Sequence, residues 1–517
     1  MSARLGWTAV AAFGMLACKD SVAPLDLAGP PVAASAIAGD NQRGVTGSAL
    51  DGALTLSVAD SAGRPNPGVV VDWTASAGTL SQQVDTTDDG GHSSVSWTLP
   101  ATPGIYTATA AVAGLGTLTF RATAQPVAGD IAFRYIDAGG YHACGITTTE
   151  QLLCWGYNAD GQLGLASTGI VSSPTLIPGD YRYRRIAGGF YHACAFTLAS
   201  EAWCWGNNGD GRLGDGSTAT QSLSPVPVVT AEVIDTLVGD TVVVGHVRLL
   251  VQALSAGEAH TCGIDLSQHV WCWGRNREGQ LGKGVVADFF PPSPVSTTEV
   301  FKDVSVGGLH TCGITVGGAG LCWGYNIAGQ LGDGSTATSA LPVAVPGIFR
   351  TDPLAIFPSP DPDFPLPPGP FIAAGYDHSC AITVAGPTLC WGLNEYGQVG
   401  DGTTANRPSP ATVAGGHAFA AITAGLRHTC ALDTDGAAWC WGDNTYGELG
   451  NGTNTRSGSP VAVAGSLQFA YLKAGELSTC GVTSTGIAYC WGDNEYGQLG
   501  DGTATSSSVP VKVAFQP

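Results

Sequence analysis

The stretch Cys322-Trp-Gly-Tyr-Asn-Ile-Ala-Gly-Gln-Leu-Gly332 recurs with small changes seven times in this chain of 517 residues. Each copy follows a segment close to the form Ala-Gly-x-x-His-x-Cys and precedes a Pro-containing segment. The first cysteines of the copies are residues 144, 194, 262, 312, 380, 430 and 480, so the period is 50 residues with two longer intervals of 68. An internal repeat of this length is typical of propellers and solenoids.

Composition favours short strands over helices in the repeats. The chain has 74 Gly and 31 Pro, and only 12% of its residues are charged, where about a quarter is usual. In the first copy the expected strands are 133–137, 142–147, 152–155 and 174–178. One such sheet cannot bury both of its faces, but seven arranged radially can. The sequence therefore predicts an all-β protein whose residues 127–517 form a seven-bladed β-propeller.

The Trp-Gly-x-Asn-x-x-Gly-Gln-Leu-Gly run resembles the repeat of the regulator of chromosome condensation family, over about three quarters of the chain. The resemblance implies a propeller fold. It also implies guanine-nucleotide exchange on a small GTPase, with chromatin binding, as one candidate function.

Residues 34–126 have the alternating pattern of a β-sandwich. Leu54, Leu56 and Val58 alternate with polar residues, and turn clusters at 60–63, 65–68 and 88–91 separate such runs. The runs Val71-Asp-Trp73 and Trp97-Thr-Leu-Pro100 resemble bacterial Ig-like domains of the invasin and intimin type. We expect an Ig-like β-sandwich that acts as a spacer and carries no site of its own.

The N-terminus has the features of an export signal. Residues 1–17 combine a short basic segment with an apolar run too short to span a bilayer. Met15-Leu16-Ala17-Cys18 resembles a bacterial lipobox, which implies lipidation of Cys18, a lipid-anchored protein in the cell envelope and a flexible tether at 18–33. The alternative is an ordinary secretory peptide cleaved after Ala23.

The remaining fourteen cysteines occur as one pair in each repeat. Each pair flanks the turn between the second and third strands, where two residues lie opposite each other in a hairpin. In an exported chain this arrangement predicts seven disulfides. A metal site built from His142, Cys144 and Cys154 is the alternative, but the seventh copy has Ser478 in place of His and keeps both cysteines. The predicted pairs are Cys144–Cys154, Cys194–Cys204, Cys262–Cys272, Cys312–Cys322, Cys380–Cys390, Cys430–Cys440 and Cys480–Cys490.

A residue present in nearly every repeat serves the fold, so function is expected where the copies differ. We expect the repeated His to bond backbone near its own turn and the repeated Trp to pack between blades. Alternating strand direction places the first turn and the third loop of each repeat on one face. The third loops carry variable, contact-prone side chains, with arginines in the third copy and aspartates in the last two, which suggests a polarised ring. The predicted partner-binding residues are Tyr157, Asp160, Arg275, Arg277, Tyr325, Tyr396, Asp443, Tyr446, Asp493 and Tyr496.

Three further segments stand apart from the repeat. Residues 231–249 are expected to form an extra hairpin, and the Pro-rich residues 347–370 an extended polyproline segment. Tyr181-Arg-Tyr-Arg-Arg185 is a small basic patch, which we interpret as a solvated strand. The runs Asn158–Gly161 and Asn208–Gly211 are expected to be turns and not calcium loops.

The sequence favours a monomeric binding protein, without a cofactor, whose propeller recognises a protein or a glycan outside the cytoplasm. A net charge of -20 argues against nucleic acid as the partner, and the lipid is the expected link to the membrane. The sequence contains no Gly-x-Ser-x-Gly or His-Glu-x-x-His motif, so no catalytic or metal-binding residues are predicted. A nucleotide-exchange factor and a propeller enzyme acting on polysaccharide are the alternatives.

Overall fold

The computed structural model describes residues 29–101, 103–125, 129, 131–179, 181–238, 241–351 and 371–516, without the side chains of 231–246. The predicted signal, Cys18, most of the tether and most of the Pro-rich insertion lie outside these residues. The chain divides into two compact units, one made mainly of residues up to 121 and one made mainly of residues from 122 onward.

The N-terminal unit is built from two sheets in the orders β1-β3-β7 and β2-β10-β9-β4-β6, with a short β5-β8 pair. Its buried side chains alternate along the strands, as they do at Leu54, Leu56 and Val58. Trp73 on the five-stranded sheet donates a hydrogen bond to Ser93 on the three-stranded sheet, so the two sheets share one core. The Ig-like assignment stays a prediction. The strands are β1 (Ala33–Ala38), β2 (Gln42–Val45), β3 (Leu54–Ala59), β4 (Val70–Ala75), β5 (Thr79–Leu80), β6 (Val84–Thr86), β7 (His92–Val95), β8 (Trp97–Thr98), β9 (Gly104–Val112) and β10 (Gly116–Gln125).

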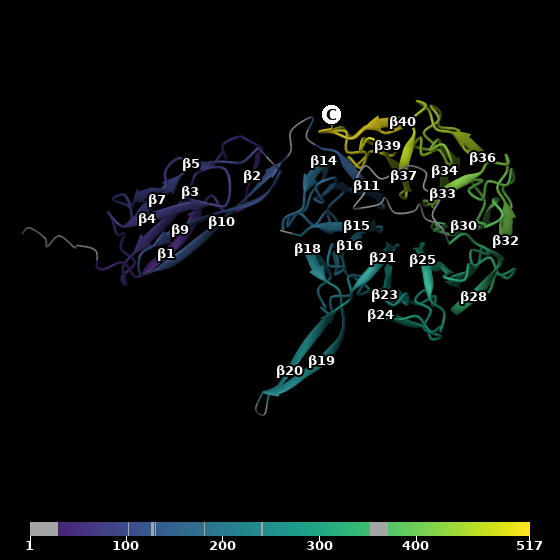
Figure 1. Ribbon diagram of the computed structural model, residues 1–517, viewed down its shortest axis with the longest axis horizontal. Coiled ribbons are helices and arrows are strands. Elements are labelled where there is room, and N and C mark those ends of the chain that lie inside the picture. Colours follow the sequence, from purple (N-terminus) through teal and green to yellow (C-terminus); the bar gives the residue numbers. More distant parts are fainter. Residues whose placement is uncertain are drawn as a thin grey trace, which may run out of the picture. The chain divides into compact units, whose positions relative to one another are not determined.

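The C-terminal unit contains seven four-stranded antiparallel sheets, each made from one continuous stretch of chain. Figure 1 shows them arranged radially, from β11–β14 round to β37–β40. The first strands line a central channel, and the fourth strands lie at the rim.

Sheet one is β11 (Phe133–Ala138), β12 (His142–Thr147), β13 (Leu152–Gly156) and β14 (Val171–Leu176); sheet two is β15 (Tyr183–Gly188), β16 (His192–Thr197), β17 (Ala202–Asn207) and β18 (Gln221–Pro227). Sheet three is β21 (Val251–Ala256), β22 (His260–Asp265), β23 (Val270–Asn276) and β24 (Ala287–Pro294); sheet four is β25 (Phe301–Val306), β26 (His310–Thr315), β27 (Ala319–Gly324) and β28 (Ser339–Ile348). Sheet five is β29 (Ile372–Ala374), β30 (His378–Ile382), β31 (Thr388–Gly392) and β32 (Arg407–Thr412); sheet six is β33 (Phe419–Ala424), β34 (His428–Asp433), β35 (Ala438–Gly442) and β36 (Ser457–Ala462). Sheet seven is β37 (Phe469–Ala474), β38 (Ser478–Thr483), β39 (Ala488–Gly492) and β40 (Ser507–Lys512). The predicted all-β propeller is confirmed.

The ring closes by direct contact between sheets one and seven. Tyr471 on β37 donates a hydrogen bond of 2.9 Å to the hydroxyl of Tyr135 on β11. Trp155 on β13 donates to the carbonyl oxygen of Gln498, which lies beyond β39. The last sheet takes all four strands from the C-terminal end of the chain, so no strand is exchanged between the two ends of the ring.

All seven predicted disulfides are present, which confirms the cysteine pairing. In every sheet the two cysteines are register partners on the second and third strands, for example Cys144 and Cys154. Their Cα atoms are 4.0 to 4.1 Å apart, as expected for a closely spaced antiparallel pair. Each bridge joins two strands of one sheet and none joins neighbouring sheets.

The predicted hairpin within 231–249 is also confirmed, as β19 (Val229–Val238) paired with β20 (Thr241–Arg248). It follows the rim strand of sheet two and extends away from the ring (Figure 1). Among the residues that the structure describes, no helix has the length and hydrophobicity needed to cross a membrane.

Candidate functional site: a tyrosine-rich face of the propeller

One face of the propeller is formed by the turn after each first strand and the loop after each third strand. Backbone hydrogen bonds join the two in every sheet, as from Tyr157 N to the carbonyl oxygen of Tyr141 at 2.9 Å. This confirms that the two segments emerge together. We call this surface the turn face; its turns are residues 139–141, 189–191, 257–259, 307–309, 375–377, 425–427 and 475–477, and its loops begin at Tyr157, Asn207, Arg275, Tyr325, Leu393, Asp443 and Asp493.

The turns form a closed circle around the mouth of the channel. Gly140 N donates to the carbonyl of Gly189 at 3.0 Å, and Glu476 N donates to the carbonyl of Gly139 at 3.1 Å. The repeated Gly permits this approach, because a Cβ on Gly139 would lie 2.5 Å from the Gly189 oxygen. The residue after each Gly therefore lies at the channel mouth; around the ring these residues are Gly140, Phe190, Glu258, Gly308, Tyr376, Leu426 and Glu476.

The repeated histidines hold neighbouring sheets together. His260 Nε2 lies 2.9 Å from Thr311 Oγ1 of the next sheet, and that hydroxyl donates to the carbonyl of Gln280. Since the hydroxyl hydrogen is used there, the imidazole Nε2–H is the donor to Thr311. The prediction that the His bonds backbone near its own turn was wrong. The same link joins His192 to Thr261, His310 to Ser379, His378 to Thr429 and His428 to Thr479.

The repeated Trp side chains pack at the same joints, as predicted. Trp391 is fully buried and donates to the carbonyl of Gln330 in the preceding sheet at 2.9 Å. Burial lowers the pKa of the histidines here, for example of His378 to about 3, so they are neutral. The repeated His and Trp are therefore structural. Among the described residues, no group of three or more His, Cys, Asp or Glu side chains is placed to hold a metal ion.

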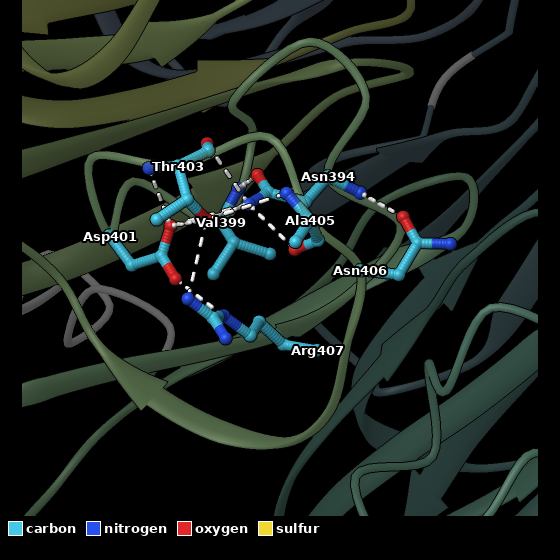
Figure 2. A network of polar contacts seen from close by, with 7 residues as sticks. All are labelled: Asn394, Val399, Asp401, Thr403, Ala405, Asn406 and Arg407. Carbon is cyan, nitrogen blue, oxygen red and sulfur yellow. Dashed lines mark hydrogen bonds and ion pairs between the residues drawn. The ribbon is translucent and has the colours of Figure 1, made fainter.

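The repeated Asn fixes the loop after each third strand. Figure 2 shows the example in sheet five, where Asn394 Oδ1 accepts from Val399 N at 2.9 Å and Asn394 Nδ2 donates to Thr403 O and Ala405 O. Asp401 organises the same loop by accepting from Thr403 and Arg407. Asn158 and Asn208 make the corresponding bonds to Leu163 N and Leu213 N in their own loops. The Asn-x-Asp-Gly runs are thus turns, as predicted.

Four tyrosines come together on this rigid frame where sheets seven, one and two meet. The ring centroids of Tyr157 and Tyr496 are 5.0 Å apart, and those of Tyr141 and Tyr496 are 5.5 Å apart, both edge-to-face. Tyr191 continues the group at 6.5 Å from Tyr141. All four side chains are partly exposed. We call Tyr141, Tyr157, Tyr191 and Tyr496 the tyrosine cluster.

Two more aromatic rings connect this cluster to the channel mouth. Phe190 lies 6.3 Å from Tyr191 and 5.6 Å from Tyr376, which belongs to sheet five on the far side of the channel. Tyr376 passes over Gly308, where a Cβ would lie 2.9 Å from the ring, and its hydroxyl bonds Glu258 of sheet three. Aromatic rings therefore lie across the mouth of the channel.

Carboxylates lie beside these rings. Glu476 reaches across Gly140 and accepts a hydrogen bond from Tyr141. Burial and the nearby charge of Glu258 raise the pKa of Glu476 to about 7 and that of Asp377 to about 6. One oxygen each of Glu258 and Glu476 is buried without a hydrogen-bond partner among the described residues. This part of the turn face favours positive charge.

The channel below the mouth is polar and small, with a cavity of about 130 Å³. The Tyr135 hydroxyl lies 3.3 Å from Asp137 Oδ2, and Lys473 lies 3.8 Å from the same oxygen. Arg185, the last residue of the predicted basic strand at 181–185, is partly exposed and also lines this channel. The strand has a bulge between Tyr183 and Arg185, which turns Arg185 toward the channel.

The structure brings together only part of the predicted site. Tyr157 and Tyr496 meet in the cluster, and Asp160 lies at its edge, where it contributes to the raised pKa of Tyr191. Tyr325, Tyr396 and Tyr446 occupy other parts of the turn face. Arg275 and Arg277 form ion pairs with Glu278 and Asp288 of their own sheet.

The predicted polarised ring is not present. Asp443 and Asp493 are 7% and 3% exposed, and they accept hydrogen bonds inside their own loops, for example from Thr445 and Gln498. The two predicted arginines are neutralised within their own sheet. The aspartates and arginines therefore organise loops and do not give the face two charged sides.

Sequence reasoning missed the turn residues Tyr141, Phe190, Tyr191, Glu258, Tyr376 and Glu476. A signal was available, because the two variable positions of Ala-Gly-x-x-His differ from copy to copy as strongly as the third loops do. Both variable sets lie on the turn face.

The repeats match two family models, both described as "Regulator of chromosome condensation (RCC1) repeat". One matches residues 133–162, 183–212, 251–280, 371–398, 419–448 and 470–498. The other matches residues 150–196, 268–314, 386–432, 435–482 and 485–517. Together they cover more than half of the chain.

Solved structures support the same fold. Human WBSCR16 is 22% identical, with a TM-score of 0.58 over 70% of this chain and 94% of its own. Yeast RCC1 (Prp20), in a structure bound to Kap60, is 20% identical, with a TM-score of 0.57 over 74% of this chain and 85% of its own. Prp20p from Saccharomyces cerevisiae, in a structure titled with its binding properties to Gsp1p and histones, is 21% identical, with a TM-score of 0.56 over 74% and 87% of the two chains. The chain belongs to the family of proteins built from regulator of chromosome condensation repeats.

Proposed function

We propose that this protein is an extracytoplasmic binding protein, anchored in the cell envelope through Cys18, whose turn face recognises another protein. The observation that carries the proposal is the tyrosine cluster, which is partly exposed and built from positions that vary among the repeats. Tyrosine suits such a surface because it buries much area and keeps a polar hydroxyl. The disulfides support an oxidising compartment.

The proposal is tested by capturing the partner on intact cells. A photo-cross-linking amino acid is placed at position 157 or 496, and the captured species is identified by mass spectrometry. The control positions are Tyr325 and Tyr446, which occupy the same places in the loops of sheets four and six. We expect a discrete protein adduct from 157 and 496 and none from the controls. Equal labelling from all four positions would contradict the choice of surface.

A nucleotide-exchange factor is the second candidate, because the chain shares its repeat and fold with Prp20p, whose structure is described together with its binding to Gsp1p and histones. The acidic charge of -20 and the seven disulfides favour the first candidate. Cell fractionation with thiol labelling separates the two. A cytosolic protein with fourteen free thiols in the repeats would favour exchange activity, whereas an envelope protein with blocked thiols supports binding outside the cytoplasm.

A further inference from the structure

In the described ring, the core of the tyrosine cluster (Tyr141, Tyr157 and Tyr496) lies at one joint, although the positions that build it recur. Tyr157 is the counterpart of Tyr325, and Tyr496 is the counterpart of Tyr396 and Tyr446. Only at the joint of sheets seven and one do tyrosines from the two loops and from the turn between them converge. The cluster is therefore a local feature and not a by-product of the repeat.

The charges that act on the cluster are negative. Burial, followed by the charge of Glu476, raises the pKa of Tyr141. Burial, Glu476 and Glu258 raise the pKa of Tyr191, and the exposed Glu495 is the main cause of the raised pKa of Tyr496. Arg212, a nearby cation, is 7% exposed and already paired with Asp210 at 2.7 Å. An incoming positive charge would therefore meet carboxylates.

The chain itself shows how a cation fits this geometry. At the joint of sheets five and six, the guanidinium of Arg427 lies 4.6 Å from the ring centroid of Tyr396. Arg427 occupies the second variable position of its turn, and Tyr141 occupies that position at the joint of sheets seven and one. The ring of Tyr396 is thus covered by a cation of the chain itself. Its counterpart Tyr496 is instead packed edge-to-face with Tyr141 and has acidic neighbours such as Glu495.

We propose that the tyrosine cluster is the docking site for a basic segment of the partner protein, with a Lys or Arg side chain placed against the exposed parts of the Tyr157 and Tyr496 rings. The negative faces of the aromatic rings attract the cation. Glu495 and Asp160 at the edge of the cluster steer the charge. This inference rests on the proposed function and specifies the chemistry of the partner.

The test uses the full chain and a defined probe. Random dodecapeptides that contain Arg or Lys are synthesised on an array, and the full chain is tested for binding to them. Each peptide has a matched neutral twin in which every Arg is citrulline and every Lys is acetyl-lysine, so that the twin keeps nearly the same shape and loses the charge. We expect the charged peptides to bind about tenfold more strongly than their twins, with the difference falling as salt rises. Equal binding of charged peptides and twins would overturn the inference.

Matched variants locate the site. Tyr157→Ala and Tyr496→Ala should remove the preference for charge, whereas Tyr325→Ala and Tyr446→Ala should keep it. Tyr496→Phe should retain most of the binding, because the ring persists. Glu495→Gln should weaken binding by about threefold, and its repeat counterpart Glu395→Gln should not. If the two control tyrosine variants lost binding equally, the cation would not be in the cluster.

The proposed function can survive the failure of this inference. A captured partner that cross-links at position 157 through an apolar or acidic segment leaves the binding function in place and overturns the basic-segment proposal. Absence of any adduct at 157 and 496, together with equal binding of charged peptides and twins, overturns both.

Discussion

His192 donates a hydrogen bond from Nε2 to the hydroxyl of Thr261, 2.8 Å away, and so joins sheet two to sheet three. The link has no counterpart at the joint of sheets one and two. There Ala193 replaces the hydroxyl residue, and neither ring nitrogen of the buried His142 has a hydrogen-bond partner among the described residues.

Ala193→Thr should therefore stabilise the propeller. The new hydroxyl can accept from His142 and donate to the Gln162 carbonyl, which already accepts from Trp205. We expect the free energy of unfolding to rise by about 1 kcal/mol, measured by chemical denaturation. In a His142→Ala background the same substitution should give no gain. A gain of the same size in both backgrounds would show that the hydroxyl acts without the imidazole.

Glu448→Gln should stabilise the protein at alkaline pH only. Glu448 is 1% exposed and stands where most copies have Gln, and burial raises its pKa to about 7. The pKa of this carboxyl is about 4.5 in the unfolded chain and about 7 in the folded protein. Between these two pH values the folded state binds more protons than the unfolded state, so the free energy of unfolding falls as the pH rises through this range. We expect Glu448→Gln to gain about 1 to 3 kcal/mol at pH 8 and little at pH 4.5, measured by thermal unfolding.

The mirror variant serves as the control for that experiment. Gln498→Glu places a carboxylate at the same position of sheet seven, beside the buried Asp493 that now accepts from Gln498. It should destabilise the protein more at pH 8 than at pH 4.5. Equal effects at both pH values would contradict the assignment to ionisation.

Acid should destabilise the joints between sheets. Burial lowers the pKa of His142 and His428 to about 4 and that of His260 and His310 to about 3. The unfolded chain binds protons at these side chains from about pH 6.5 downward and the folded chain only near 3 to 4. The contribution of the neutral histidines to the free energy of unfolding is therefore fully present above pH 6.5, and it is lost as the pH is lowered from 6.5 toward 3. A His428→Gln variant should show a smaller loss between pH 6.5 and 4.5 in thermal unfolding, and an unchanged slope would contradict this cause.

Removal of one disulfide should weaken the fold without abolishing it. Cys262→Ser with Cys272→Ser opens a loop with a sequence separation of 10 residues. Loop entropy predicts a loss of about 2 to 3 kcal/mol. Calorimetry should show a lower melting temperature with the ring still folded, because six other bridges and all joints remain. A loss confined to sheet three in hydrogen exchange would show that the sheets unfold separately.

The sequence predicted the inner parts of the fold well because the Cys-Trp-Gly run gives every sheet the same frame. The expected strands 142–147 and 152–155 match β12 and β13 closely. The rim strand β14 begins at Val171 and not at residue 174, since its outer edge has no strict alternation to mark its start.

The contacts between sheets could not be predicted in the same way. The partner of His192 is 69 residues further along the chain, and Tyr157 meets Tyr496 only because the ring closes. The two tyrosines were identified individually from the variability of their loops, but their convergence depends on which sheets are neighbours. Arg275 and Asp493 were overvalued because their local partners, Glu278 and Gln498, are visible only in the folded loops.

Every sheet of the ring is a single uninterrupted piece of chain, and the joint of sheets seven and one keeps the buried Trp hydrogen bond that other joints have. Duplication or loss of one gene segment of a single repeat would therefore add or remove a whole wedge without cutting any sheet. The size of the ring could change in evolution by such events, while the tyrosines at one joint are replaced independently to recognise different proteins.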